Sequence, residues 1–149
     1  MPKAAISRKL SDRELLAWRT FLRAHSTITR QLESELVVAH SLSLPEYGVL
    51  VTLVEAPDHR LRMTELADQV LLSRSGLTRL VDRMQQSGLV DRVRCPSDAR
   101  GTEAALTDLG YQRLKEASGV HLRGVREHVT SRLTDDELDQ LSDLMNKLV

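Results

Sequence analysis

The segment from Ser73 to Gly88 restricts what this chain can fold into more than any other stretch. Its apolar residues recur at the i, i+3, i+4 and i+7 spacing of one helix face, and they are Leu77, Leu80, Val81 and Met84. The opposite face is polar and basic. Ser73 is a favourable N-cap, and Gly88 suits the position just beyond a helix C-terminus. We therefore predict a short helix that buries one face and leaves the other free to bind a partner.

The residues on either side of this segment predict a helix-turn-helix followed by a hairpin. Thr64 is a candidate N-cap for a helix over residues 64–71, and a turn of about three residues joins that helix to the next. After Gly88 the apolar period changes from 3.6 to 2, so residues 89–106 are predicted to form a β-hairpin. Its turn is the segment CPSDARG. A hairpin directly after a helix-turn-helix is a wing.

Longer helix patterns flank this unit. Ser11 and Glu14 form a capping box at the start of the first helix, and a second helix is expected to begin near Pro45. Thr107 and Thr134 are the predicted caps of two C-terminal helices. One face of the first helix is a stripe that holds Leu15, Trp18, Leu22, His25, Thr29, Leu32 and Leu36. A small domain cannot cover so long a stripe, so we expect a partner subunit to pack against it.

The predicted fold class is α+β, mainly α: a winged helix-turn-helix domain flanked by long N- and C-terminal dimerisation helices. The expected parts are an N-terminal dimerisation helix over residues 1–42, the DNA-binding lobe over 43–106 and C-terminal dimerisation helices over 107–149.

Charge supports a nucleic-acid partner through its distribution only. The chain holds 21 Lys and Arg against 21 Asp and Glu, so the net charge is zero. Residues 60–101 hold 8 basic and 5 acidic residues, a net charge of +3, whereas residues 102–149 hold 6 and 9, a net charge of −3. Every basic residue in the middle part is arginine, which suits forked contacts to phosphate and guanine.

Composition predicts a soluble cytoplasmic protein. With 41% hydrophobic and 3% aromatic residues, the chain suits helices that pack through aliphatic side chains. No apolar run approaches the roughly 20 residues of a membrane span, so we expect no membrane partner. The N-terminal segment also lacks an apolar signal core. A single cysteine excludes an intramolecular disulfide.

Four motifs follow one another between residues 73 and 110: a serine-led helix, a GLV turn, the D-x-R element formed by Asp98 and Arg100, and an LTxxG helix start. With the order of the helices, they give nearly the whole chain a resemblance to the MarR family of bacterial transcription regulators. The resemblance implies a homodimer whose two winged helices bind a pseudo-palindromic operator in double-stranded DNA. It also implies a repressor that a small aromatic or phenolic effector releases.

On this interpretation the DNA contacts come from the front of the helix and from the wing. Ser75, Thr78 and Arg79 are expected to reach base edges, and Arg79 is the best candidate for a bidentate contact with guanine. Arg74 and the helix amides are expected to hold phosphate, and Arg100 to enter the flanking minor groove. We expect Asp98 to hold the wing arginine or the turn in place. The predicted DNA-binding residues are Ser73, Arg74, Ser75, Thr78, Arg79, Asp98 and Arg100.

Three other charged residues are assigned no base contact. Arg92 and Arg94 alternate along the hairpin, as charged residues do on the solvent side of any hairpin. Asp82 lies on the polar helix face and favours the simpler interpretation that this face is only solvated.

By the same resemblance, an effector cleft is expected between the dimer helices and the DNA-binding lobe. Its candidate lining residues are Trp18, His25, Thr29 and Tyr47. The alternative, in which each is a hydrogen-bonded group at a helix crossing, is favoured for each residue taken alone.

Cys95 and two histidines are the remaining candidates for chemistry. Cys95 lies in the wing loop and is expected to be exposed near positive charge, which favours oxidation. Peroxide sensors of the resembled family carry their reactive cysteine in the first helix, where this chain has none, so a passive Cys95 is favoured over a redox-responsive regulator. His121 and His128 lie too far apart on one helix to chelate an ion alone, so we expect no metal and no cofactor.

The sequence lacks the motifs of an enzyme. It contains no nucleophile elbow, no Gly-rich phosphate loop and no HExxH motif. The alternative from another class is a winged-helix protein-interaction module that does not bind DNA. Affinity for duplex DNA and its salt dependence would separate the two functions.

Overall fold

A computed structural model of the protein describes residues 9–149, and within this range the chain forms six α-helices, two 3-10 turns and three strands. The helices are α1 (Asp12–His40), α2 (Leu44–Glu55), α3 (Met63–Val70), α4 (Arg74–Gln86), α5 (Asp108–His128) and α6 (Asp135–Asn146). The strands are β1 (Arg60–Arg62), β2 (Val90–Cys95) and β3 (Asp98–Leu106), and the 3-10 turns are η1 (Pro57–His59) and η2 (Thr130–Arg132). The predicted fold class is confirmed, while the division into three domains stays a prediction.

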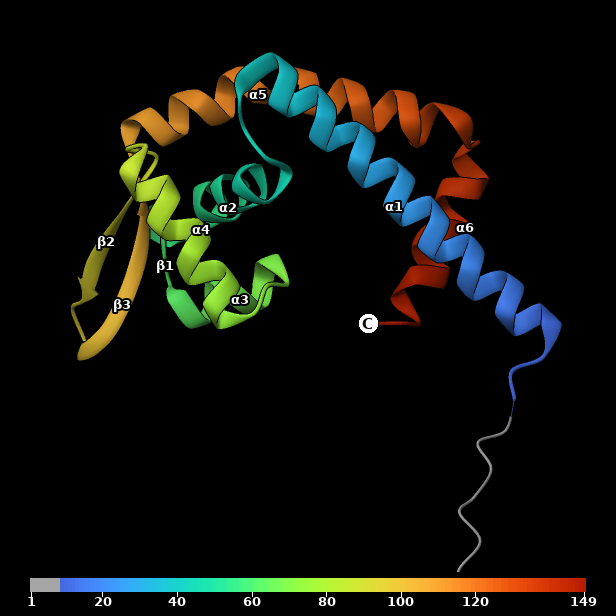
Figure 1. The fold of residues 1–149 in the computed structure, drawn as a ribbon, viewed down its shortest axis with the longest axis horizontal. Coiled ribbons are helices and arrows are strands. Elements are labelled where there is room, and N and C mark those ends of the chain that lie inside the picture. The colour runs from blue at the N-terminus through green and yellow to red at the C-terminus, as the bar shows by residue number, and fades with distance from the viewer. Residues whose placement is uncertain (1–8) are drawn as a thin grey trace, which may run out of the picture.

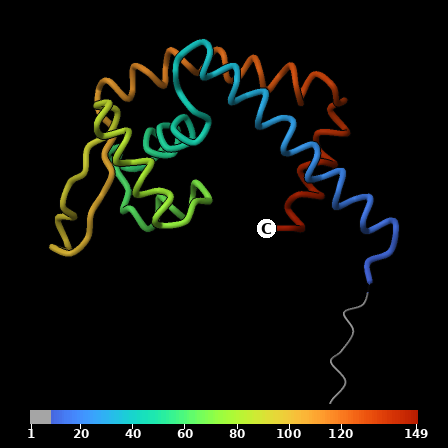
Figure 2. Tube along the Cα trace, viewed as in Figure 1, coloured from blue at the N-terminus to red at the C-terminus, as the bar shows by residue number. Residues whose placement is uncertain are grey.

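The elements form two limbs that α5 joins at the top of the molecule (Figure 1). One limb is a compact lobe that holds α2, α3, α4 and the sheet, and the other holds the N-terminal half of α1 and α6. α5 runs from the wing toward the second limb and packs against α1. The C-terminus lies between the two limbs (Figure 2).

The sheet has the order β1-β3-β2, and both strand pairs are antiparallel. β2 and β3 form the predicted hairpin, whose register runs from Val90 opposite Leu106 to Cys95 opposite Asp98, with an irregularity between Arg94 and Cys95. β1 pairs with the other side of β3, where Arg62 lies opposite Glu103. The wing is therefore joined to the segment that leads into the helix-turn-helix.

Side-chain caps fix where most helices begin. The capping boxes at Ser11 and Thr134 and the cap at Thr107 are present as predicted, and Ser43 forms a further capping box at the start of α2. In each case a side-chain oxygen accepts an otherwise unpaired amide hydrogen of the first turn.

The predicted cap of α3 is wrong. α3 begins at Met63, so Thr64 lies inside its first turn. Arg62 occupies the cap position and forms no side-chain capping bond. Because β1 stays paired with β3 as far as Arg62, the chain passes directly from strand to helix and reaches the helical conformation earlier than the residue types suggest.

The hydrophobic core lies mainly in the lobe. Its fully buried side chains come from α2, α3, α4, α5, β2, β3, the end of α1 and the turn that follows α1. The largest are Leu36, Leu42, Leu50, Leu53, Leu66, Leu77, Met84, Val49, Val81 and Val90. Leucine, valine and methionine fill this core, as the composition predicts.

The long stripe of α1 is buried only near its C-terminal end. Leu32 and Leu36 are buried, whereas Trp18 is 53% exposed and Leu22 is 43% exposed. α6, which ends at Asn146, also leaves apolar side chains exposed, among them Leu141 and Leu144. A single chain therefore leaves much of the second limb uncovered.

α5 is one continuous helix despite its two interior glycines. Gly119 has open space around it, but Gly124 lies where α1 crosses, and a Cβ there would be 2.8 Å from a methyl carbon of Leu32. The missing side chain at Gly124 lets the two long helices approach closely, which explains a residue that otherwise disfavours a helix.

Within the described residues, no single helix is long and apolar enough to cross a membrane. α1 and α2 are long and apolar enough only when taken together, and their axes are bent by 84° at the junction. The predicted lack of a signal core concerns in part residues 1–8, which lie outside the described residues.

Two glycines of α5 test how closely this helix packs on the lobe. A Cβ on Gly110 would clash with the carbonyl oxygen of Leu89, whereas one on Gly119 meets nothing within 4 Å. We expect Gly110→Ala to lower the free energy of unfolding by about 2 kcal/mol, because backbone must shift. Gly119→Ala should raise it by about 0.5–1 kcal/mol, since alanine favours a helix. Denaturant unfolding followed by circular dichroism measures both, and equal effects would contradict the close contact.

Candidate nucleic-acid interface

α4 is the predicted amphipathic helix, and both of its predicted ends are confirmed. The Oγ atom of Ser73 accepts the amide hydrogen of Gly76 at 3.1 Å, which caps the helix. Gly88 lies just beyond the C-terminus with a φ of 76°, a conformation that costs glycine little. All four residues of the apolar stripe are buried: Leu77, Leu80, Val81 and Met84.

The front of α4 presents the predicted side chains to solvent. Arg74, Ser75, Thr78 and Arg79 are all exposed. Neither Arg74 nor Arg79 forms an ion pair within residues 9–149. The Thr78 hydroxyl donates to the carbonyl of Arg74 at 2.8 Å, so its hydrogen is already used. Thr78 can therefore offer a partner only its oxygen lone pairs and its methyl group.

Asp82 and Arg92, which were assigned no base contact, join α4 to the wing. One terminal nitrogen of the Arg92 guanidinium donates a hydrogen bond to the Asp82 carboxylate and forms an ion pair with it. The other terminal nitrogen donates to the carbonyl of Thr78 at 3.1 Å. One side chain of β2 thus holds α4 at two points, which fixes the wing against the helix that it follows.

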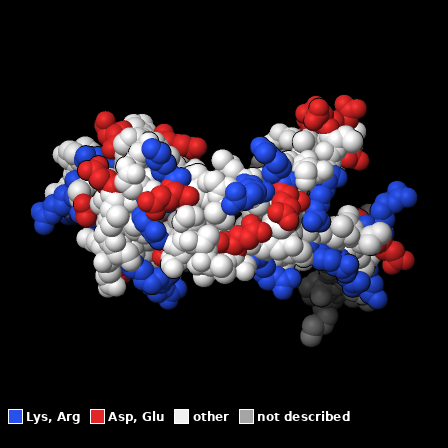
Figure 3. Space-filling view, turned by 90° about the horizontal axis from the view of Figure 1, so that it is seen from above, with Lys and Arg blue, Asp and Glu red and all other residues white. Residues whose placement is uncertain are grey.

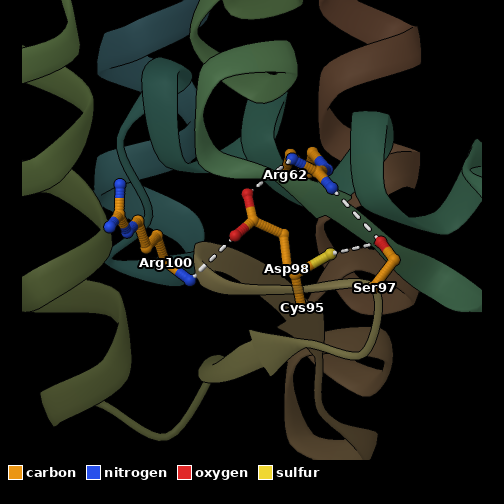
Figure 4. Close-up of polar contacts among 5 residues, drawn as sticks. All are labelled: Arg62, Cys95, Ser97, Asp98 and Arg100. Carbon is orange, nitrogen blue, oxygen red and sulfur yellow. Dashed lines mark hydrogen bonds and ion pairs between the residues drawn. The ribbon is translucent and has the colours of Figure 1, made fainter.

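At the tip of the wing, Asp98 holds the turn, which was one of its two expected roles. An oxygen of its carboxylate accepts the amide hydrogen of Arg100 at 3.0 Å (Figure 4). The Arg100 guanidinium forms no ion pair with Asp98 and stays exposed. The acid thus fixes the backbone of the wing arginine and leaves its charged group free.

The wing and the helix-turn-helix enclose a shared cleft of about 530 Å³. Arg62, Arg92 and Arg100 line it together with Thr78 and Asp98. Three guanidinium groups beside one carboxylate make this cleft suitable for a polyanion. The face of the molecule on the side of α5 instead mixes basic and acidic residues over its surface (Figure 3).

The expected exposure of Cys95 is wrong. Its side chain is only 6% exposed, and its Sγ atom lies 3.3 Å from the hydroxyl of Ser97 (Figure 4). The irregular register after Arg94 turns this residue inward, under Gly101, whose missing side chain leaves room for it. Burial removes the access that rapid oxidation of a thiol requires.

Of the four residues predicted to line an effector cleft, the structure brings two together. His25 and Tyr47 line a hollow of about 580 Å³ between α1, α2, α5 and the turn after α3. Thr29 lines a different hollow, and its hydroxyl donates to the carbonyl of His25 at 2.8 Å. Trp18 lies on exposed α1 and stacks against Phe21, with ring centroids 6.1 Å apart.

His121 completes this hollow, a role that the sequence did not indicate. Its ring lies over Tyr47, with centroids 4.3 Å apart. Burial lowers the pKa of His121, and the carboxylate of Glu35 opposes this change. The ring is therefore neutral near pH 7, and it can donate one hydrogen bond and accept another. Across residues 9–149, no three His, Cys, Asp or Glu side chains gather as metal ligands would.

Sequence reasoning missed the residues that hold the interface in shape. The sequence did not assign Arg62 or Arg92 to the interface, and Asp82 favoured the interpretation that this face of α4 is only solvated. Their contacts join residues that are far apart in the chain, so no short motif contains both partners. The change of period after Gly88 placed Arg92 on the hairpin but could not show which side chain it meets.

Replacing Arg92 tests the connection between the wing and α4. Arg92→Ala should lower the free energy of unfolding by about 1 kcal/mol, because an ion pair and a hydrogen bond between partly exposed groups are lost together. Arg94→Ala, which alters an exposed arginine of the same strand, should change it by less than about 0.5 kcal/mol. Chemical unfolding of both variants measures the difference. Indistinguishable stabilities would show that the contact does not hold the wing.

Comparison with known proteins matches this arrangement to a family. A model of the MarR family matches residues 40–101. Sco3205, a MarR family transcriptional regulator from Streptomyces coelicolor crystallised in complex with DNA, has a similar structure, with a TM-score of 0.90 and 37% identity. The match covers 97% of this chain and 91% of that one. AbsC, a MarR family transcriptional regulator from the same organism, gives a TM-score of 0.88 at 34% identity and 95% coverage of each chain.

A curated relative matches over almost the same length. The HTH-type transcriptional regulator MhqR of Bacillus subtilis (strain 168) is 24% identical over 139 residues, which is 93% of each chain. The high identity to Sco3205 and AbsC over nearly their whole lengths shows what the fold alone could not. This chain belongs to the MarR family of transcriptional regulators.

Proposed function

We propose that this chain is a regulator of transcription that binds double-stranded DNA sequence-specifically. The observation that carries the proposal is the shared cleft, which Thr78 of the recognition helix and Arg100 of the wing line together. A helix in the major groove and an arginine over the adjacent minor groove need such a fixed arrangement. The family consists of transcriptional regulators rather than enzymes, and the relative Sco3205 was crystallised with DNA.

Base recognition is assigned to the front of α4. Arg79 is exposed, and it forms no ion pair with an acid among residues 9–149. Its five N–H donors are therefore free for the two acceptors on the major-groove edge of guanine. Thr78 has used its only hydrogen, which suits it to a base amino group or to the methyl group of thymine. Ser75 lies beside the cap and has a hydroxyl that can donate or accept.

Phosphate and minor-groove contacts would surround these base contacts. Arg74 is the first residue of α4, where the free amides and the positive end of the helix dipole both attract phosphate. The free guanidinium of Arg100 would enter the flanking minor groove, whose narrow A·T-rich segments attract arginine. Ser73 would act mainly through its cap, which fixes the first turn of α4.

A second copy of the chain is the proposed partner of the exposed apolar limb. The uncovered side chains of α1 and α6 include Trp18, Phe21, Leu22, Leu141 and Leu144. A single chain in water would leave this area hydrated at a cost of about 25 cal/mol for each Å² of apolar surface. Two lobes related by a two-fold axis would place their recognition helices about 10 bp apart, which matches a pseudo-palindromic operator.

The hollow that holds His25, Tyr47 and His121 is the proposed effector site. It is lined mainly by apolar side chains of α2 and of the turn after α3, together with the aromatic rings of His25, Tyr47 and His121. A small aromatic ligand would find both stacking surface and hydrogen-bond partners there. A ligand that binds better to a lobe spacing unsuited to DNA would release a repressor by population shift. Such a regulator would act in the cytoplasm.

Two arginines should affect DNA binding in different ways. Using a duplex that the wild-type protein selects from a random library, we expect Arg79→Ala to lose about 1–3 kcal/mol of discrimination at one base position. Arg100→Ala should weaken binding whatever the central sequence is and lower the salt slope by about one. Fluorescence anisotropy at several salt concentrations measures both effects.

The control is Lys115→Ala, which removes an exposed positive charge from α5, and it should leave both quantities unchanged. If Arg79→Ala weakened binding to selected and random duplexes equally, its role in base recognition would be refuted. A wild-type protein without salt-dependent duplex binding would instead favour a protein-interaction module.

Sedimentation tests the proposed dimer. The wild-type chain should sediment as a dimer at micromolar concentration. Leu144→Glu should shift it toward the monomer, because a charge is then buried against an apolar partner surface. Leu109→Glu is the matched control, since Leu109 is 51% exposed and Leu144 is 54% exposed, but Leu109 lies on the lobe side of α5. A monomeric wild type, or equal effects of the two variants, would contradict this dimer.

A further inference from the structure

Arg62 belongs to the helix-turn-helix segment, yet its side chain ends at the tip of the wing (Figure 4). It is the last residue of β1 and precedes α3 directly. One terminal nitrogen donates to the Ser97 hydroxyl at 3.3 Å, and the other lies 3.7 Å from a carboxylate oxygen of Asp98. A single guanidinium thus connects the lobe to Ser97 in the hairpin turn and to Asp98, the first residue of β3.

The sequence of β3 leaves a path for this side chain. Arg62 lies opposite Glu103, and Gly101 follows two residues nearer the tip on the same face of the strand. A Cβ on Gly101 would lie 3.5 Å from the Arg62 guanidinium and 3.1 Å from the Cβ of Cys95. A longer side chain would occupy the space that the guanidinium crosses. Glycine at this position therefore allows Arg62 to reach the tip.

The Asp98 carboxylate transmits the position of Arg62 to Arg100. One of its oxygens accepts the amide hydrogen of Arg100 at 3.0 Å, while the other faces Arg62. The side chains of Arg62 and Asp98 are 39% and 45% exposed, and ion pairs so exposed add little to stability. The significance of the contact is geometric, because it links the wing tip to the segment that leads into α3.

We propose that Arg62 is a positioning residue for DNA binding. Through Asp98 it holds Arg100 at the level of the flanking minor groove, and it thereby sets a preference for A·T-rich flanking base pairs. The inference rests on the proposed function. Its physical basis is that the attraction of a narrow groove for arginine acts only on a guanidinium held inside the groove, so a loose tip reads groove width poorly.

Arg62 could instead bind a phosphate itself, since it lines the cleft beside the wing. The two roles predict different results. A phosphate ligand contributes equally whatever the flanking sequence is, and its loss lowers the salt slope. A positioning residue changes the discrimination between flanks, and its effect disappears when Asp98 can no longer transmit it.

The test compares affinities for two forms of the duplex that the wild-type protein selects from a random library, one with A·T and one with G·C flanks. We expect Arg62→Ala and Asp98→Asn each to reduce the ratio of these affinities about fivefold. The double variant should reduce it no further. Arg62→Lys, which retains the charge, should restore part of the ratio.

Arg60→Ala is the matched control, because Arg60 lies on the same strand, is 44% exposed and pairs with Glu103 rather than with the wing tip. It should leave the ratio unchanged. Asp98→Asn keeps an acceptor for the Arg100 amide and removes only the charge that faces Arg62. It therefore tests the connection even where Arg62→Ala does not fold.

Three results would overturn the inference: equal losses on both flanks with a salt slope lower by about one, additive effects of the two substitutions, or a wild type without flank preference. A wild type that selects no duplex at all would refute the proposed function instead.

Discussion

The rest of the interface depends on the burial of the apolar stripe of α4. Leu77, Leu80, Val81 and Met84 share one core cluster with residues of α2 and β2. Fully burying such side chains contributes about 1.5–3 kcal/mol each. Successive residues of a helix are about 100° apart, so α4 cannot rotate by one position without withdrawing part of this stripe from the core. The core thus determines that Thr78 and Arg79 face outward, and any base contact follows from that orientation.

The wing is positioned differently, by charged groups near the surface. Asp82 and Asp98 are acids on a face suited to a polyanion, and each repels phosphate. Each also fixes an arginine from another element: Asp82 holds Arg92 of β2 to α4, and Asp98 connects Arg62 to the wing tip. An arginine that is already held in place loses less side-chain freedom on binding, and this offsets part of the repulsion from the two acids.

Local sequence patterns predicted the helices, most caps, the hairpin and the exposed front of α4, because each of these depends on residues within one or two turns. What failed depends on distant contacts. Strand pairing with β3 moved the start of α3 ahead of Thr64. Irregular register and the space at Gly101 buried Cys95. His121 and Tyr47 meet across two helices, and periodicity can place each on a face but cannot show that those faces are opposed.

The hollow lined by His25, Tyr47 and His121 is placed so that a bound ligand could affect the orientation of the lobe. Tyr47 belongs to the buried core of the lobe, while His121 lies on α5, the helix that joins the lobe to the second limb. A ligand in the hollow that both residues line would contact both sides of the joint, so its affinity would depend on the angle at which α5 leaves the lobe. Moving such an equilibrium from 1:99 to 99:1 requires about 5.5 kcal/mol of differential affinity. A small ligand can supply this difference only if it loses most of its contacts when α5 takes the other orientation. A hollow lined by both limbs changes more between the two orientations than a hollow within the lobe would.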